Sequence, residues 1–414
     1  MKHKFINHYS DIQFLLLMVL AAFPILPKGV QSTLIIIMSV LSIIYFFIDG
    51  KKYWSIKKTK VLMVLGSLLF ISSLSLFYSN DVRLGFKYIL RLSPVILIVL
   101  VLLIKKTAVL KIDQLYKILL VYVISLFVLL LFLYFNFYAQ INDNDISPWE
   151  LRSHIEEWTN VHGTYLSMWI GMGILILIWL FQKFFIKIWM KMIGVLFFIC
   201  FYYWLYIIGA RMPFFATVVS SILLFSFSLK VPLKFISIGF LIAGISGFIL
   251  FGYQIYSKVE ELSNYENAIP PGKYENTNPL ISNENIRSVI YYCSLKNIVE
   301  KPFFGYGVGS VNQKMQECYD REFSQTDLFK RFQFNSHSQY LQVILSSGLI
   351  GFLLYVISLV ILTKWSFRCI KLHFGFLILI LLCFTFENIL YRHDGIIFFS
   401  FFNTILFFAR NKEN

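Results

Sequence analysis

The chain has 414 residues, of which 58% are apolar, 18% aromatic and 14% charged, and its formal net charge is +15. Soluble domains carry about 45–50% apolar and about 25% charged residues, so this composition excludes a soluble globular protein and a disordered chain. Five cysteines in so long a chain also exclude a disulfide scaffold. The composition is that of an integral membrane protein, in which positive charge reports topology before it reports nucleic-acid binding.

Long apolar stretches follow one another along most of the chain. A spanning helix needs about 20 mostly apolar residues. Stretches of this kind occur at approximately 12–28, 30–49, 61–78, 84–104, 115–136, 161–181, 189–208, 212–229, 233–252, 340–363, 373–391 and 396–409. The sequence therefore predicts an all-α polytopic membrane protein with about twelve transmembrane helices. We expect residues 1–252 to hold helices one to nine, 253–339 to form a large outer loop with a helical second half, and 340–414 to hold helices ten to twelve.

The short loops between these stretches differ in charge. Lysine and arginine gather in alternate loops, at 51–60, 105–111, 183–191, 230–234 and 364–371. Because cytoplasmic loops carry an excess of these residues, the pattern places those loops and both termini in the cytoplasm. The loops at 136–160 and 253–339 then face the opposite side, where most of the acidic residues lie.

A few cations occur at the predicted outer edge of the membrane. Ionisable residues at this depth are rare and often functional. The candidates are Arg83, Lys87 and Arg91, spaced on one helical face, Arg211 just before a span, Arg287 in the large loop, and His337 just before the tenth span. Each alone could be a lipid-headgroup anchor or a helix cap, but together they favour a site for a phosphate or pyrophosphate.

Four motifs around these residues resemble those of the O-antigen ligase/polymerase superfamily. The most specific is His337-Ser338, nine residues, Gly348, two residues and Gly351. The second is Arg287 followed by Pro302-Phe-Phe-Gly305-Tyr-Gly307-Val-Gly309. The third is Gly209-Ala210-Arg211, and the fourth is His162-Gly-Thr-Tyr165, which resembles a span's first residues in some relatives.

The resemblance implies a C-type glycosyltransferase-like membrane enzyme of the bacterial inner membrane, with an active site facing the periplasm. Such enzymes take a glycan from undecaprenyl pyrophosphate with inversion and without a metal or other cofactor. On this basis His337 is the expected general base, and Arg211 and Arg287 are expected to act on the pyrophosphate. The expected binding residues for the lipid-linked glycan are Arg83, Lys87, Arg91, His162 and Tyr165.

We favour an O-antigen ligase, with lipid A–core oligosaccharide as acceptor, because the spacing after His337 matches the ligase pattern. A polysaccharide polymerase and a protein O-oligosaccharyltransferase share the same motifs and stay open. From other classes, a multi-span transporter or flippase and a structural assembly factor also stay open. Membrane lipids are expected partners and nucleic acid is not.

Several other polar residues have less specific interpretations. Asp143 and Asp145 form a D-x-D-like pair, which in a solvated loop is more typical of a turn than of a metal site. Glu387 and the Arg392-His393-Asp394 turn are expected to form buried structural ion pairs. Cys293 and Cys318 fall in one outer loop, where a disulfide is possible but not indicated by spacing.

Overall fold

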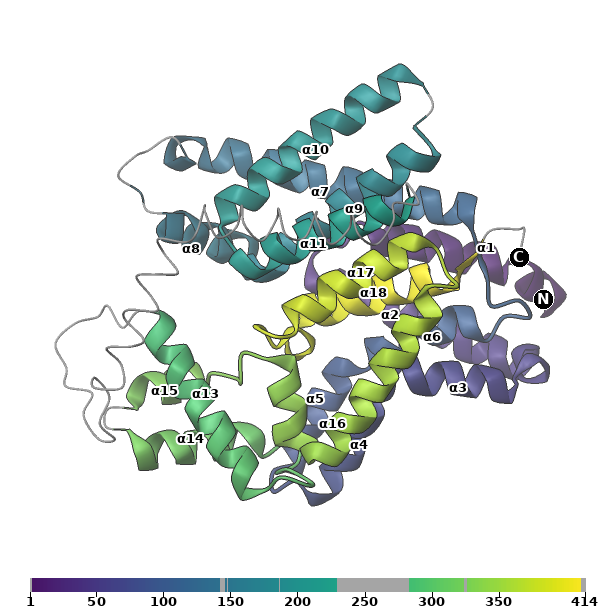
Figure 1. Cartoon of the computed structure of the whole chain (residues 1–414). Helices are drawn as coiled ribbons and strands as arrows, with labels where there is room; N and C mark the ends of the chain where they lie inside the picture. Colours follow the sequence, from purple (N-terminus) through teal and green to yellow (C-terminus); the bar gives the residue numbers. More distant parts are fainter. Residues whose placement is uncertain are drawn as a thin grey trace.

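Helices account for nearly all regular structure in the residues that the computed structural model describes, which are 2–141, 146, 148–185, 187–228, 283–323 and 326–410. The predicted ninth span (233–252) and the pair Asp143 and Asp145 lie outside these residues. Figure 1 shows long helices running side by side through most of the molecule, with a separate group of helices, drawn in green, beyond one of their ends.

The first half of the chain supplies the helices that begin the bundle. They are α1 (Lys2–Ala21), α2 (Lys28–Ile48), η1 (Gly50–Tyr53), α3 (Ile56–Leu65), α4 (Ser67–Ser75), η2 (Leu76–Tyr78), α5 (Val82–Leu92), α6 (Pro94–Leu103), α7 (Ile112–Ile141), α8 (Pro148–Thr159), α9 (Gly163–Lys183), α10 (Ile188–Ile208) and α11 (Arg211–Ser228).

The second half supplies the separate group α13–α15 and the last bundle helices. They are α13 (Asn283–Glu300), α14 (Val311–Glu322), α15 (Asp327–Phe332), α16 (Gln339–Ser366), α17 (Lys371–Cys383), η4 (Ile389–Tyr391) and α18 (His393–Phe408). The two-residue strands β1 (Leu110–Lys111) and β2 (Ala409–Arg410) pair in parallel. The helices α13, α14 and α15 all lie within the stretch 253–339.

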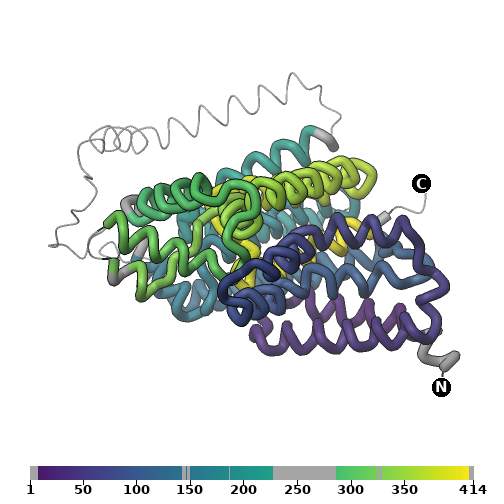
Figure 2. The backbone as a smooth tube through the Cα atoms, turned by 90° about the horizontal axis from the view of Figure 1, so that it is seen from below, coloured from purple at the N-terminus to yellow at the C-terminus, as the bar shows by residue number. Residues whose placement is uncertain are grey.

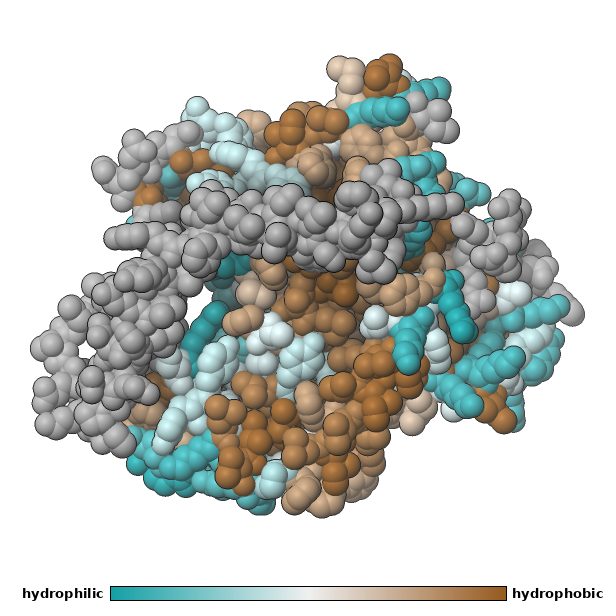
Figure 3. Space-filling model, viewed as in Figure 1, coloured by the Kyte–Doolittle hydropathy of each residue, from teal (hydrophilic) through white to brown (hydrophobic). Residues whose placement is uncertain are grey.

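Six described helices are long and apolar enough to cross a membrane, or seven if α3 and the α4–η2 segment form one span. Shorter apolar helices lie within α1, α11, α17 and α18. The chain is thus an all-α, multi-pass membrane protein. Figure 3 shows a wide apolar surface along the lower edge of the view, where α16 exposes Leu353, Leu354 and Ile357. In a membrane protein such a surface faces lipid tails.

Several helices differ from the uninterrupted spans that the sequence predicts. The stretch 61–78 is bent by 72° where α3 meets α4 at Gly66, and a side chain at this position would collide with Ile96 of α6. The stretch 84–104 divides into α5 and α6 at Ser93, followed by Pro94. α17 ends at Cys383 rather than near 391, since the chain turns through Phe384–Asn388 before η4.

The two ends of the bundle differ in composition. At one end, Lys58 Nζ donates to the carbonyl of Lys105 (2.6 Å), and β1 meets β2, so the basic loops gather there. Figure 2 shows the start of α1 and the end of α18 at this end and α13–α15 at the opposite end. At that opposite end, Lys28 Nζ contacts Asp394 Oδ2 at 2.8 Å and the carbonyl of Asn160 at 2.7 Å. These contacts join the first turns of α2 and α18 to the corner before α9, and they confirm the structural ion pair expected for Asp394.

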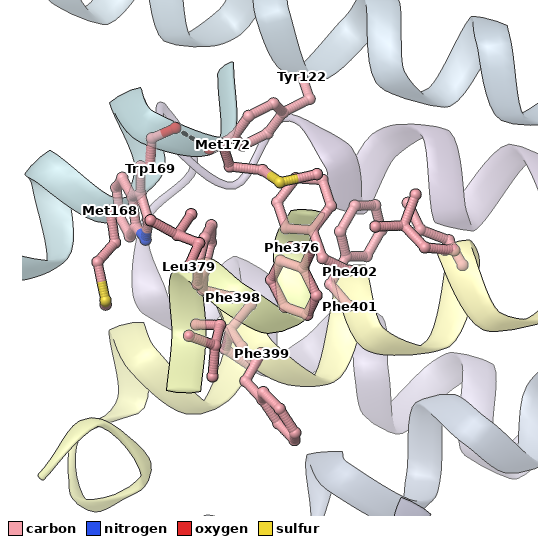
Figure 4. Packing of buried hydrophobic residues seen from close by; sticks show 14 of the residues in the cluster. Tyr122, Met168, Trp169, Met172, Phe376, Leu379, Phe398, Phe399, Phe401 and Phe402 are labelled. Carbon is pink, nitrogen blue, oxygen red and sulfur yellow. Dashed lines mark hydrogen bonds between the residues drawn. The ribbon is translucent and has the colours of Figure 1, made fainter. Parts of the chain in front are cut away.

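The core is aromatic and lies where α7, α9, α17 and α18 meet. Phe23 packs against Tyr122, Trp169, Phe398, Phe401 and Phe402 with ring centroids 5.1–6.5 Å apart. The Tyr122 hydroxyl donates to the carbonyl of Trp169 at 2.8 Å, which Figure 4 marks among the packed rings. This rigid group fixes the helix ends that carry the candidate site.

Candidate active site

A buried carboxylate, Glu387, lies at the centre of the site. Its residue is 6% exposed and follows the end of α17, where its amide donates to the carbonyl of Cys383 at 3.1 Å. A buried charge needs partners. The nearest is His337, whose Nδ1 lies 3.7 Å from Glu387 Oε2. Glu387 therefore forms the buried ion pair that the sequence predicts for it, and its partner is the candidate base His337.

His337 is held in an unusual conformation. Its φ is +45°, a region that non-glycine residues seldom occupy and that often marks a functional site. Its amide donates to Asn335 Oδ1 at 2.9 Å, and the next residue, Ser338, caps α16 through the amide of Leu341. These contacts fix the ring beside Glu387 while 22% of the side chain stays exposed. With its proton on Nδ1, facing the carboxylate, the ring leaves the lone pair of Nε2 free to accept a proton.

Positive charge reaches Glu387 from three separate segments. Burial raises the pKa of Glu387. The close contact with His337 and the charges of His337, His162 and Arg287 lower this pKa, and together they outweigh the effect of burial. The pKa of this carboxyl therefore lies below its ordinary value, and Glu387 stays ionised at neutral pH. Arg287 lies half-buried on the first turns of α13. The structure thus brings together His337, Arg287 and His162 around one carboxylate.

The corner between α8 and α9 fixes His162. Glu156 Oε1 accepts from Arg152 Nε and from the amide of Gly163, both at 2.7 Å, and Glu156 Oε2 lies 3.8 Å from His162 Nε2. His162 caps α9 by accepting the amide of Thr164 on Nδ1 (3.3 Å), which places its proton on Nε2, toward Glu156. Burial lowers the pKa of His162 despite the opposing charges of Glu156 and Glu387.

The sequence analysis missed Arg152 and Glu156. One signal could have found them, since the two residues lie four apart in a polar segment directly before His162. Glu156 contacts both the amide of Gly163 and the ring of His162, so a residue outside the His162-Gly-Thr-Tyr165 motif holds the start of α9.

Tyr165 lies beneath the site. It is fully buried, and its hydroxyl donates to the carbonyl of Asn388 at 3.4 Å. Asn388 follows Glu387 directly, so Tyr165 reaches the site by holding the turn that carries the carboxylate.

Arg211 lies at the same end of the bundle. It is the exposed first residue of α11, which packs on α9 and α17. The starts of α9 and α11 and the end of α17 share one end of this group (Figure 1), so Arg211 belongs to the end that carries His162 and Glu387. Pro213 occupies the first turn of α11, where a missing amide hydrogen has no effect on the helix.

The three cations of α5 are exposed along one helix. Arg91 Nη1 donates to the carbonyl of Tyr391 (3.1 Å), and its guanidinium lies 5.9 Å from the centre of the Tyr391 ring. Arg91 therefore contacts the segment that follows Glu387. Lys87 and Arg83 lie one and two turns further from this contact, and the structure does not bring them to Glu387 by any described interaction.

This arrangement combines a base with an orienting carboxylate and side-chain cations from α11 and α13. Such a set can remove a proton from a hydroxyl and stabilise a negatively charged leaving group. Comparison with known families supports this chemistry: residues 195–356 match the family described as O-antigen ligase. The match contains Arg211, Arg287 and His337, and it confirms the resemblance seen in the motifs. No curated protein matches the chain.

Proposed function

With an O-antigen ligase domain at residues 195–356, we propose that the protein transfers a glycan from undecaprenyl pyrophosphate to lipid A–core oligosaccharide. We place the reaction on the periplasmic face of the bacterial inner membrane. The observation that carries the proposal is the pairing of His337 Nδ1 with Glu387 Oε2 at 3.7 Å, in a place that Arg287 also reaches.

The proposed step is a single displacement. An acceptor hydroxyl transfers its proton to His337 Nε2 as its oxygen bonds to the anomeric carbon of the donor sugar. The bond from that carbon to the pyrophosphate oxygen breaks, and its electron pair leaves with undecaprenyl pyrophosphate. Attack opposite the leaving group inverts the anomeric carbon. Ionised Glu387 stabilises the imidazolium that forms on His337, in the way that a carboxylate serves a catalytic histidine.

The side-chain cations take up the charge of the leaving group. Arg287 and Arg211 present planar guanidinium groups, which suit bidentate contacts with phosphate oxygens. His162 adds an Nε2–H donor at the edge of the same site. The proposed reaction uses these side chains and invokes no cofactor.

Three substitutions test the site. His337→Ala, Arg287→Ala and Arg211→Ala should each abolish transfer by purified protein given lipid-linked donor and lipid A–core acceptor. Protein amount and membrane insertion should match wild type. Exposed Glu157→Gln is a matched control on the same end of the molecule and should keep full transfer. Wild-type transfer by all three variants would overturn the site.

The acceptor is tested separately in a deletion strain. Loss of all polymer from lipid A–core, with lipid-linked polymer accumulating, identifies a ligase. A single repeat unit still attached to the core identifies a polymerase, and missing glycan on proteins with normal lipopolysaccharide identifies a protein oligosaccharyltransferase.

A further inference from the structure

α16 is interrupted near the candidate site, and backbone groups on both sides of the interruption lack their usual helical hydrogen bonds. Gly348 has φ +63° and ψ −172°, which interrupts the helix. In a continuous helix, Leu349 and Ile350 would donate to the carbonyls of Leu345 and Ser346, four residues earlier. Here these four groups have other partners, so the first part of α16 (339–347) is set at an angle to the second (349–366). Figure 1 shows this bend at the lower edge of the molecule.

The glycine-rich loop after α13 supplies the missing partners. The amides of Tyr306 and Gly307 donate to the carbonyls of Leu345 (2.9 Å) and Ser346 (3.0 Å). In return, the carbonyls of Pro302 and Phe303 accept from the amides of Leu349 (2.7 Å) and Ile350 (3.3 Å). We call these contacts, between residues 302–307 and 345–350, the loop–helix seam. All four groups released by the break are satisfied by it, as buried backbone groups require.

The fit of the seam requires glycine on both sides. A methyl group on Gly348 would collide with the backbone carbonyl of Phe303, and one on Gly305 (φ +67°) would meet the carbonyl of Leu345. Both residues also have positive φ, which other residues adopt only with strain. The two glycine motifs noted in the sequence are therefore the two halves of one contact.

A third segment anchors the seam to the bundle. Ser75 Oγ accepts the amide of Val308 at 3.2 Å, and Ser79 Oγ accepts the amide of Gly309 at 2.9 Å. Both serines lie at the corner where α4 leads to α5. The loop is thus held between this corner and the break in α16.

The seam lies between the two helices that carry the candidate catalytic groups. The loop of the seam begins two residues after the end of α13, the helix that carries Arg287. The other side of the seam lies at the end of the first part of α16, which begins two residues after His337. Leu345 also packs in one buried cluster with Val289 and Ile290 of α13, and the Cys293–Cys318 disulfide joins α13 to α14. A change at the seam must therefore alter the position of α13 relative to the start of α16.

We propose that the loop–helix seam is a positioning element that holds Arg287 and His337 in register for the reaction. This inference rests on the proposed function, because it assigns both residues to one step. A misplacement of about 1 Å lowers the rate of such a step about 100-fold. The glycines of the seam touch no substrate and act only through the helices that they join.

The main test variant is Gly348→Ala, with Gly29→Ala as its matched control. Gly29 lies in the first turn of α2, and nothing lies within 4 Å of the position that its Cβ would take. We expect Gly348→Ala to lower kcat for glycan transfer about 100-fold and to change the apparent KM for the lipid-linked donor by less than about threefold. Gly29→Ala should match wild type in both constants. Ser79→Ala removes the hydrogen bonds of Ser79 Oγ to the amide of Gly309 and to Ser310 Oγ. It is a milder variant that keeps the test valid if Gly348→Ala fails to fold, with kcat expected about tenfold lower.

Backbone hydrogen exchange gives a readout independent of activity. In Gly348→Ala and Ser79→Ala, the amides of Tyr306 and Leu349 should exchange at least about tenfold faster, and so should segments 286–291 and 339–345. The amides of α9 should be unchanged. Faster exchange confined to the seam, or an unchanged kcat in a variant whose seam has opened, would overturn the inference.

The same data separate this inference from the proposed function. If wild-type protein transfers no glycan, the proposed function fails. The exchange of segments 286–291 and 339–345 then decides by itself whether the seam positions the two helices.

Discussion

Glu387→Gln removes one charge from the centre of the site while keeping the size of the side chain. At 3.7 Å and an effective dielectric constant of about 20, the carboxylate attracts an imidazolium on His337 by about 4.5 kcal/mol. The actual loss should be smaller, because water reaches the partly exposed His337 and the glutamine amide oxygen can still accept a hydrogen bond. We expect the transition state to lose about 2.7 kcal/mol of stabilisation, which corresponds to about 100-fold in kcat/KM.

The measurement is steady-state transfer by purified protein from pH 5 to about pH 9. If Glu387 acts through His337, the double variant His337→Ala/Glu387→Gln should be no less active than His337→Ala alone. Exposed Glu157→Gln should leave both the rate and the profile unchanged. A Glu387→Gln variant within about threefold of wild type at neutral pH would refute the pairing of carboxylate and base.

Three further predictions concern stability. The pKa of Glu387 is lower in the folded protein than its ordinary value of 4.5, so its charge stabilises the fold above that pH. This contribution is lost as the pH falls through the lower folded pKa. On acidification the melting temperature of wild type should therefore fall more than that of Glu387→Gln. Lys28→Met leaves the buried Asp394 carboxylate without its 2.8 Å partner and should lower the free energy of unfolding by about 3 kcal/mol, a loss that Lys28→Arg should largely avoid in chemical denaturation. Cys293→Ser removes the disulfide to Cys318, 25 residues away, and should destabilise the α13–α14 pair by about 3 kcal/mol, measured by hydrogen exchange. Wild type should show the same loss under reducing conditions and no loss under oxidising conditions, which would confirm that the disulfide is the cause.

Local composition was sufficient to predict the helices and the candidate cations. A run of about 20 apolar residues can satisfy its backbone in a membrane only as a helix, so the spans follow from hydropathy alone. Charged residues are costly there, which is why Arg211, Arg287 and His337 are visible in the sequence without any knowledge of the fold. The helical second half of the large loop was visible for the same local reason, the spacing of its apolar residues.

The broken helices could not be predicted in this way. Hydropathy does not register a change of direction, so the bend at Gly66 and the break at Gly348 both lie inside apolar stretches that the sequence predicts as single spans. At each glycine a neighbour distant in the chain fills the space that a side chain would need: the side chain of Ile96 in the first case and the carbonyl of Phe303 in the second.

The sequence alone therefore indicated the class of the protein, the long apolar helices among the described residues and the candidate cations. Only the tertiary structure placed Glu387 beside His337, 50 positions earlier in the chain, and only the structure joined the glycines at 305 and 348 in one contact. The physical reason is the range of the interactions. Hydrophobicity and helix periodicity act over one or two turns, whereas the partner of a buried charge or of a freed backbone group is chosen by how whole helices pack.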